Sequence, residues 1–230
     1  MLRKALRALI GGRISAQFFN RDIWANFEVT AVLLSAAGKF IFIDWLQQDM
    51  WFALAAGGAW LVYIAARIRR HPQLIYAWGF SSKNLKPTVL IAAPVTAAAV
   101  AGAVLYGLLS GQALLHWHMW VVLLLYPAWG VVQQFLLVVL VAGNLDRRMS
   151  RSRLPRLLIV LPTALLFGVV HIPIPILMVI TFFMGCFTTT LFLRYRSVWA
   201  LGVFHGLLAT ALYYFVLGQD PLNGFLQAAA

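Results

Sequence analysis

Four polar side chains interrupt the long apolar runs of this 230-residue chain: Gln133, Gln134, His171 and His205. Imidazole can accept or release a proton near neutral pH, and a primary amide can hold a water molecule without titrating. An unpaired polar group in hydrocarbon costs on the order of a few kcal/mol, so these side chains should face one another or a water-filled cavity. Together they could hold and deprotonate water, or form a buried polar network that only locks helices together.

The composition indicates an integral membrane protein. The chain is 63% hydrophobic and only 10% charged, whereas about a quarter of the residues of a soluble domain are charged. Apolar runs of about 20 residues cross a bilayer as helices. We therefore predict an all-α polytopic bundle that forms a single domain over residues 1–230, with about seven spans near residues 29–46, 50–66, 88–110, 118–143, 157–172, 174–193 and 197–217.

The positive charge is arranged as in a membrane protein. The net charge of +12 comes from basic residues in the N-terminal segment and in every second connection, with Lys39 inside a span as the exception. Cytoplasmic connections are enriched in Lys and Arg, so we predict a cytoplasmic N-terminus and an external C-terminus. Residues 1–25 are predicted to form a cytoplasmic amphipathic segment on the membrane surface, without the features of a cleavable signal peptide. Membrane lipids are the expected partners, and nucleic acid is not.

The charged residues of the first span raise a question of pairing. Lys39 and Asp44 are five residues apart, which places them about 140° apart around an α-helix and makes a direct ion pair awkward. Lys39 is expected to snorkel or to reach another helix, although Lys39, Glu28 or Asp44 could also join a polar site. Glu28 is the only glutamate in the chain.

The residues that commonly bind metals do not form a convincing pattern. His116 and His118, separated by one residue, would point to different sides of a helix. The single cysteine, Cys186, allows no intramolecular disulfide and no cysteine-based metal site. His171 and His205 have no carboxylate or thiolate near them in the sequence, which makes a poor zinc site. We therefore predict no metal and no cofactor.

The polar residues in the C-terminal half of the chain are predicted to lie at similar depths in the membrane. At about 1.5 Å per residue, Gln133, His171 and His205 lie roughly 12 to 20 Å from the cytoplasmic ends of their helices. That depth is near the middle of a hydrocarbon core about 30 Å thick. Each group needs the others as hydrogen-bond partners there. The sequence thus predicts one shared site within the membrane.

The order of these motifs resembles that of the CPBP family. This family of membrane proteases includes the type II prenyl-protein (CAAX) endopeptidases and bacteriocin-processing and abortive-infection proteins. Its motifs are Glu-Glu-x-x-x-Arg, Phe-x-x-x-His and His-x-x-x-Asn. Phe167-x-x-x-His171 is similar to the second motif, His205 stands in the third, and Gln133-Gln134 stands where the paired glutamates are expected. The resemblance covers about residues 85–215.

The resemblance implies an intramembrane endopeptidase that acts on membrane-associated or prenylated peptides. By this comparison Gln133, next to Gln134, replaces the glutamate base, His171 holds the water, and His205 faces the oxyanion. Ala209 occupies the asparagine position and Val138 the arginine position. Because a glutamine amide cannot accept a proton, His171 would have to act as the general base.

Two alternatives remain open. The first is a catalytically inactive relative that keeps the cavity to bind a lipid or a lipidated peptide. The second is a small transporter, or a haem protein ligated by His171 and His205. The expected location is a bacterial inner (plasma) membrane, and the sequence sets no oligomeric state.

Overall fold

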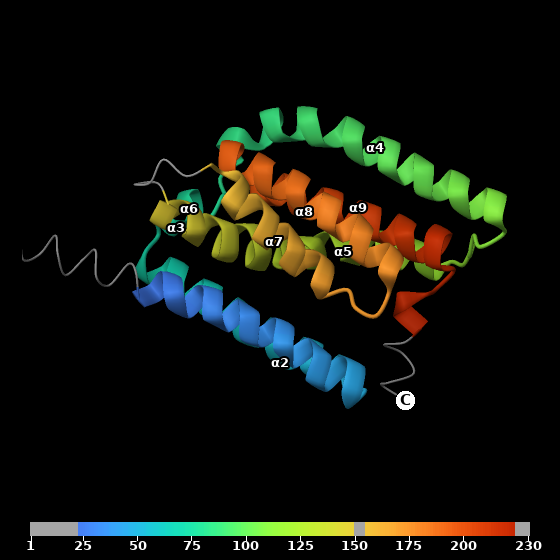
Figure 1. Cartoon of the computed structure of the whole chain (residues 1–230), viewed down its shortest axis with the longest axis horizontal. Coiled ribbons are helices and arrows are strands. Elements are labelled where there is room, and N and C mark those ends of the chain that lie inside the picture. Colours follow the sequence, from blue (N-terminus) through green and yellow to red (C-terminus); the bar gives the residue numbers. More distant parts are fainter. Residues whose placement is uncertain (1–22, 150–154, 224–230) are drawn as a thin grey trace, which may run out of the picture.

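The computed structural model describes residues 23–149 and 155–223, and the regular structure within these ranges is entirely helical (Figure 1). The predicted amphipathic segment at residues 1–25 lies almost wholly outside the described residues. Among the described residues, six helices are long and apolar enough to cross a membrane. The predicted helical membrane bundle is therefore confirmed.

Most of the six spanning helices are built from several shorter elements. The spans are Ile23–Trp45, Met50–Arg70, Leu74–Ser110, His118–Met149, Pro175–Tyr195 and Val198–Leu217. Their elements are η1 (Lys39–Trp45), α2 (Asp49–Arg70), α3 (Leu74–Ala77), η2 (Ser82–Asn84), α4 (Leu85–Ser110), α5 (His118–Gln134), η3 (Phe135–Ala142), α6 (Gly143–Met149), α8 (Pro175–Tyr195), α9 (Val198–Ala211) and η4 (Leu212–Leu217).

The span predicted at residues 157–172 is shorter than expected. The helix α7 (Leu157–Val169) has 13 residues, which gives a length of about 20 Å, less than the thickness of the hydrocarbon core. The chain then turns, with hydrogen bonds from the His171 N–H to the Gly168 carbonyl and from the Ile174 N–H to the His171 carbonyl. Pro173 has no N–H with which to continue the helix. His171 consequently lies in the turn between α7 and α8.

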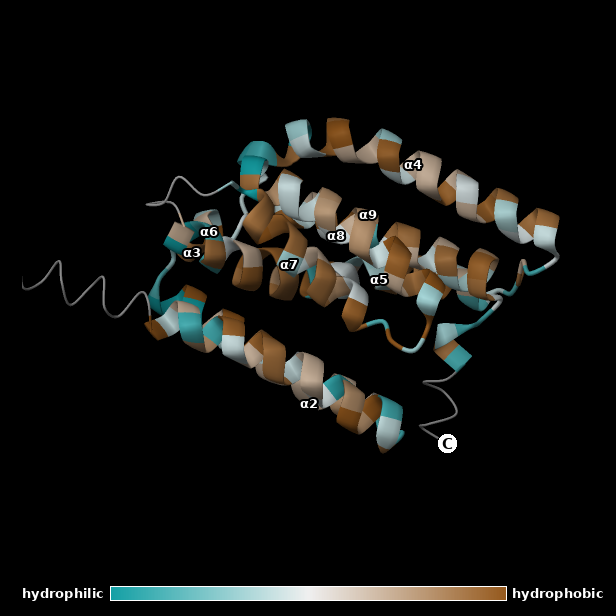
Figure 2. Cartoon of the chain, viewed as in Figure 1, coloured by the Kyte–Doolittle hydropathy of each residue, from teal (hydrophilic) through white to brown (hydrophobic). Residues whose placement is uncertain are grey.

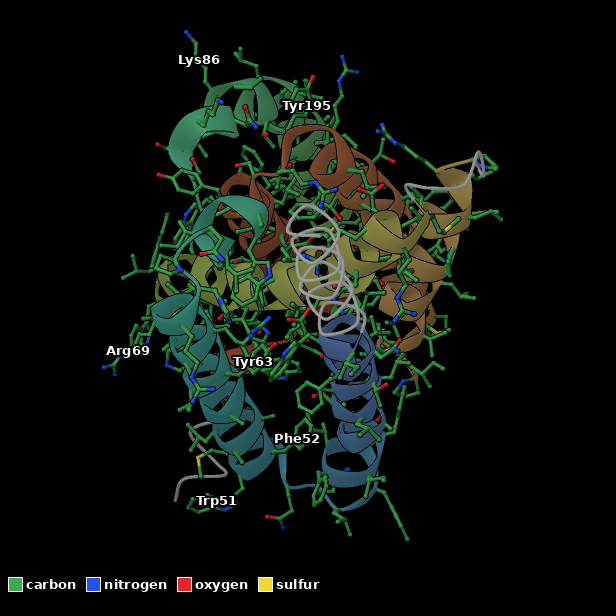
Figure 3. All side chains as sticks on the ribbon, turned by 90° about the vertical axis from the view of Figure 1, so that its left-hand side faces the viewer. Trp51, Phe52, Tyr63, Arg69, Lys86 and Tyr195 are labelled. Atoms are coloured by element: carbon green, nitrogen blue, oxygen red, sulfur yellow. The ribbon has the colours of Figure 1, made fainter. Side chains whose placement is uncertain are left out.

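The surface of the bundle is suited to lipid. Large apolar side chains are exposed on its outside, among them Val62, Leu109 and Leu124, which are 70 to 80% exposed. Figure 2 shows hydrophobic residues along the outer faces of α2 and α4. Arg69 near the end of α2 and Lys86 near the start of α4 point outward (Figure 3), and these helix ends lie on the left of Figure 1, opposite the α7–α8 turn. This basic end is the predicted cytoplasmic side.

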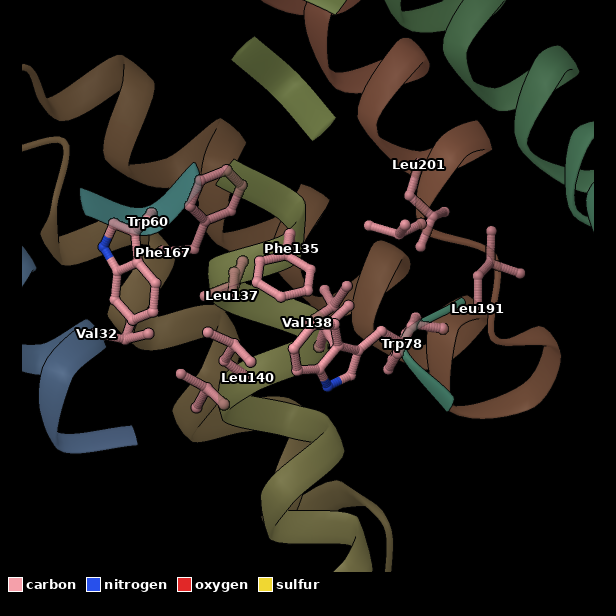
Figure 4. Packing of buried hydrophobic residues seen from close by; sticks show 14 of the residues in the cluster. Val32, Trp60, Trp78, Phe135, Leu137, Val138, Leu140, Phe167, Leu191 and Leu201 are labelled. Carbon is pink, nitrogen blue, oxygen red and sulfur yellow. The ribbon is translucent and has the colours of Figure 1, made fainter. Parts of the chain in front are cut away.

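The core is centred on the π-helix η3. Phe135, Val138 and Leu140 of η3 are fully buried, and the Phe135 ring packs edge to face on Trp78, with ring centroids 5.1 Å apart (Figure 4). Val138 occupies the position where the family has arginine. A valine there continues the apolar core instead of introducing a charge.

Helices α5 and α9 approach each other at glycines. A Cβ atom on Gly202 would lie 2.4 Å from the Val131 Cα, and one on Gly206 would lie 2.4 Å from the Pro127 nitrogen. The spacing Gly202-x-x-x-Gly206 places both glycines on one face of α9, a pattern that permits close packing of membrane helices. This contact brings the C-terminal end of α5 next to His205.

The prediction that helical spacing makes a direct Lys39–Asp44 pair awkward is wrong. Lys39 Nζ lies 2.7 Å from Asp44 Oδ2, and it also donates to the Ile172 carbonyl at 2.7 Å. Residues 39–45 form the π-helix η1, whose i→i+5 repeat brings residues five apart onto one face. Lys39 therefore connects the first span to the turn that carries His171.

Candidate functional site

The C-terminal end of α5 and the middle of α9 are joined by a polar contact. Gln134 Nε2 lies 3.1 Å from His205 Nδ1, and both side chains are buried. An amide nitrogen can only donate, so His205 Nδ1 accepts, and the ring proton is on Nε2. Gln134 Oε1 is buried with no hydrogen-bond partner among the described residues. A residue placed only to join helices is expected to have its polar atoms satisfied.

Phe167 connects the two histidines. Its ring packs edge to face against His171 at a centroid distance of 5.2 Å and against His205 at 5.4 Å. His171 lies in the turn just after α7, and the bond between its Nδ1 and the Phe167 carbonyl at 2.7 Å folds its ring back toward Phe167. The second and third motifs of the sequence therefore meet through this ring.

The orientation of His171 is set by the end of α7. Its Nδ1 lies 2.7 Å from the Phe167 carbonyl oxygen. A carbonyl oxygen only accepts, so Nδ1 carries the proton and Nε2 keeps its lone pair. The Thr181 hydroxyl of α8 donates to the Leu177 carbonyl at 2.6 Å, and its oxygen also lies 3.3 Å from the Phe167 carbonyl oxygen. With Lys39 on the neighbouring Ile172 carbonyl, polar contacts from two elements hold this turn.

Gln133, His171 and His205 line one cavity of about 70 Å³. Liquid water occupies about 30 Å³ per molecule, so a space of this size suits a few water molecules and not a peptide. Three of the four predicted site residues thus share a cavity, and Gln134 contacts one of them. The other lining residues are Tyr126, Trp129, Leu177, Thr181, Met184, Ala209, Leu212 and Tyr213.

A larger apolar groove adjoins this cavity. It has a volume of about 310 Å³ and lies between α4, α8 and α9, and it shares His205 and Met184 with the polar cavity. The other residues that line it are Ala92, Val95, Thr96, Ala99, Val179, Ile180, Phe183, Phe187, Thr188, Leu201, Phe204 and Leu208. The small cavity and the larger apolar groove therefore adjoin each other at His205 and Met184.

Several residues of the cavity were not predicted from the sequence. Tyr126 and Tyr213 pack edge to face with ring centroids 5.9 Å apart, and Trp129 and Thr181 also line the space. Tyrosine, tryptophan and threonine are common throughout membrane helices. The one signal available in the sequence was position: Trp129 and Tyr126 lie about one and two turns before Gln133, respectively, on the same side of α5.

The acidic residue Glu28 does not join the site. It is 2% exposed and accepts hydrogen bonds from Tyr63 at 2.6 Å and from Asn144 at 2.7 Å, with Arg67 and Arg147 each 3.8 Å away. This cluster joins the first span to α2 and α6 at the basic end of the bundle. Asp44 is paired with Lys39.

Removing Glu28 should reduce stability without affecting catalysis. The change Glu28→Ala leaves Tyr63, Asn144 and two arginines without their shared acceptor, and loss of one member of a buried charged cluster costs about 3 kcal/mol or more. We expect a lower midpoint of thermal unfolding in detergent. Asp44→Asn, in the more exposed pair with Lys39, should cost less than about 1 kcal/mol. Equal effects of the two changes would contradict a structural role for the Glu28 cluster.

The argument that separated His116 from His118 is also wrong. Helix α5 begins at His118, so His116 precedes the helix and is not constrained by helical geometry. Both side chains approach Asp220, which follows η4. None of the three residues of this second cluster is among those that line the cavity.

One comparison with known proteins gives a match. A family model described as type II CAAX prenyl endopeptidase Rce1-like matches residues 115–211. No curated protein and no solved structure matches the chain significantly. The matched segment contains the polar pair on α5, Phe167 and both histidines of the cavity.

Proposed function

We propose that this chain, whose residues 115–211 match a family model described as type II CAAX prenyl endopeptidase Rce1-like, is an intramembrane peptidase that cleaves lipid-modified peptides. The match confirms the predicted CPBP resemblance and supports a CPBP-type intramembrane hydrolase. The proposal that the substrate is a lipid-modified peptide rests on one observation: the small cavity and the apolar groove are both lined by His205. The small cavity suits water, and the apolar groove suits a lipid chain attached to the substrate.

Three residues would carry out the hydrolysis. Gln133 holds the water through its amide, and the lone pair on His171 Nε2 takes a proton as the water oxygen attacks the scissile carbonyl. The N–H of His205 Nε2 donates to the oxyanion that forms. The carbon–nitrogen bond then breaks, and His171 returns the proton to the leaving amine. A neutral imidazole can accept the proton from water and then donate it to the leaving amine near pH 7.

A second candidate is a catalytically inactive relative. Among the described residues, the cavity is lined by amide, imidazole, hydroxyl and apolar groups, with no carboxylate. Such a protein would use the groove to bind a lipid or a lipidated peptide without cleaving it. The haem hypothesis fits poorly, because a cavity of about 70 Å³ with Phe167 packed against both histidines leaves no room for a macrocycle.

The proposed setting is the bacterial inner membrane. Arg69, Arg70 and Arg194 lie in the last turns of α2 and α8, and these helix ends lie on the left of Figure 1, as expected for the cytoplasmic face. Membrane lipids are the proposed partners, and a lipidated or transmembrane peptide is the proposed substrate.

The proposal is tested by peptide cleavage in proteoliposomes. A farnesylated reporter peptide is incubated with the wild-type protein and with His205→Ala, and the released C-terminal fragment is measured by mass spectrometry. Loss of one oxyanion donor should lower kcat by about 10²- to 10³-fold. His71→Ala, which removes an exposed histidine at the end of α2, is the matched control. Binding of the farnesylated peptide without cleavage by the wild-type protein would instead favour the inactive relative.

A further inference from the structure

A second polar cluster lies at the external end of the bundle. His116 lies in the connection between α4 and α5, His118 is the first residue of α5, and Asp220 follows η4. The chain segments that carry them lie side by side at the right-hand end of Figure 1. The proposed hydrolysis makes no use of these three residues.

The three side chains bring ligand atoms together. Asp220 Oδ2 lies 2.5 Å from His118 Nδ1 and 3.6 Å from His116 Nδ1. Each of the three residues offers one possible ligand atom, and these three atoms all lie within 4.8 Å of one another. The two imidazole rings contact each other, with centroids 4.3 Å apart. One histidine would be enough to form a hydrogen bond with Asp220. Here two histidines approach the same carboxylate oxygen, as they would around a shared metal ion.

The carboxylate of Asp220 is oriented by other groups. Its Oδ1 accepts hydrogen bonds from the Tyr214 hydroxyl at 2.7 Å and from the Leu222 N–H at 3.1 Å. This arrangement leaves Oδ2 facing the histidines. Hydrogen bonds to the second oxygen of a ligating carboxylate are typical of metal sites, because they fix the direction of the ligand.

The backbone positions the cluster independently of these side chains. The Leu114 N–H donates to the Tyr214 carbonyl at 2.8 Å, which ties the α4–α5 connection to η4. Gly218 has a φ of +60°, and a Cβ there would lie 2.9 Å from the Gln112 carbonyl oxygen. The two segments that carry the ligands are therefore held together by main-chain contacts before any ion binds.

We propose that His116, His118 and Asp220 bind a zinc ion at the external surface of the membrane. Two imidazoles and one carboxylate suit zinc, whereas calcium and magnesium prefer oxygen ligands alone. Tetrahedral ligands about 2.0–2.1 Å from zinc lie about 3.3 Å from one another. The two observed distances to Asp220 Oδ2 fall on either side of this value, so small side-chain movements suffice.

The exposure of the cluster leaves a place for a fourth ligand. The side chains of His118 and Asp220 are about 10% exposed, whereas that of His116 is 43% exposed. A water molecule can complete the tetrahedron from this open side. The ion would join the start of α5 to the segment after η4. Other residues of α5 and η4 line the polar cavity. The role of the ion is to hold these two ends together.

Zinc binding is measured on chelator-treated protein purified in detergent without a histidine tag. The wild-type protein is titrated with zinc chloride, and bound metal is quantified after equilibrium dialysis. We expect about one equivalent of tightly bound zinc and a higher midpoint of thermal unfolding, because a ligand that binds only the folded state stabilises it. Absence of such binding in the wild-type protein would overturn the proposal.

Matched variants locate the ion. His116→Ala removes the most exposed ligand, and Asp220→Asn keeps an oxygen acceptor for Tyr214 and Leu222. Each should raise the zinc dissociation constant by about tenfold or more and abolish the shift in unfolding midpoint. His71→Ala should leave both unchanged. Equal affinities of the wild-type protein, His116→Ala and Asp220→Asn would overturn the site, since His116→Ala is expected to fold in any case.

Discussion

Replacing His171 by alanine is expected to lower the rate of peptide cleavage by about 10²- to 10⁴-fold, the usual contribution of a general base. His171 lines the polar cavity with Gln133 and His205, and its Nδ1–H is committed to the Phe167 carbonyl at 2.7 Å. Nε2 is therefore the ring nitrogen available to take a proton from water. The measurement is release of the C-terminal fragment of the farnesylated reporter in proteoliposomes.

The variant His171→Asn separates catalysis from folding. An asparagine amide can still donate to the Phe167 carbonyl, so the turn between α7 and α8 should keep its polar contact. It cannot accept a proton. We expect His171→Asn to unfold close to the wild-type temperature and to be as inactive as His171→Ala. An asparagine variant that cleaves the reporter at the wild-type rate would show that His171 is not the base.

The change Gln133→Glu should raise the cleavage rate by about tenfold or more, which is less than the full contribution of a general base because His171 already fills that role. Gln133 lines the cavity at the position where the family has its first glutamate. A carboxylate there can take a proton from water, which an amide cannot do, and general-base assistance contributes about 10²- to 10⁴-fold. The buried carboxylate should also lower the unfolding midpoint, because its charge loses hydration. Initial rates of reporter cleavage measure the gain.

The neighbouring change Gln134→Glu is the matched control. Gln134 is fully buried and contacts His205 at 3.1 Å, and it is not among the residues that line the cavity. A carboxylate at this position would pair with the imidazole and not with water, so no gain of activity is expected. If both variants accelerate cleavage equally, the role assigned to Gln133 is wrong. If neither cleaves while both bind the reporter, the inactive relative is favoured.

The position of the site could be predicted because polar groups are rare in these helices. Gln133, His171 and His205 were placed at similar depth by counting residues along each span, and the structure brings them to one cavity. Their roles in catalysis stay predictions. The composition and the run lengths were likewise sufficient to predict a helical membrane bundle, since a bilayer permits few other folds.

The errors came from local geometry that hydropathy does not encode. The pairing of Lys39 with Asp44 depends on the π-helix η1, whereas the sequence argument assumed 100° per residue. The predicted span 157–172 was too long because apolar residues continue past Val169 into the turn. Hydropathy measures how well a segment dissolves in lipid, and it does not report where the helical hydrogen bonds stop.

Contacts between distant segments could not be predicted either. His118 meets Asp220 across 102 residues of sequence, and Tyr126 meets Tyr213 only because α5 packs against α9 and η4. Each of these residues is unremarkable in its own segment. Their proximity follows from the packing of whole helices, which a single sequence does not specify.

The glycine contact between α5 and α9 has a mechanical consequence for the site. At Gly202 and Gly206 the main chains of the two helices come into contact, and one methyl group of Val131 also packs against Gly202. Side-chain rotamer changes should therefore have little effect on the distance between α5 and α9. The positions of Gln134 and His205 along the two helices are fixed relative to each other by this backbone contact. Fluctuations in bilayer thickness can tilt this pair of helices together, but the register between the amide and the imidazole should not slip.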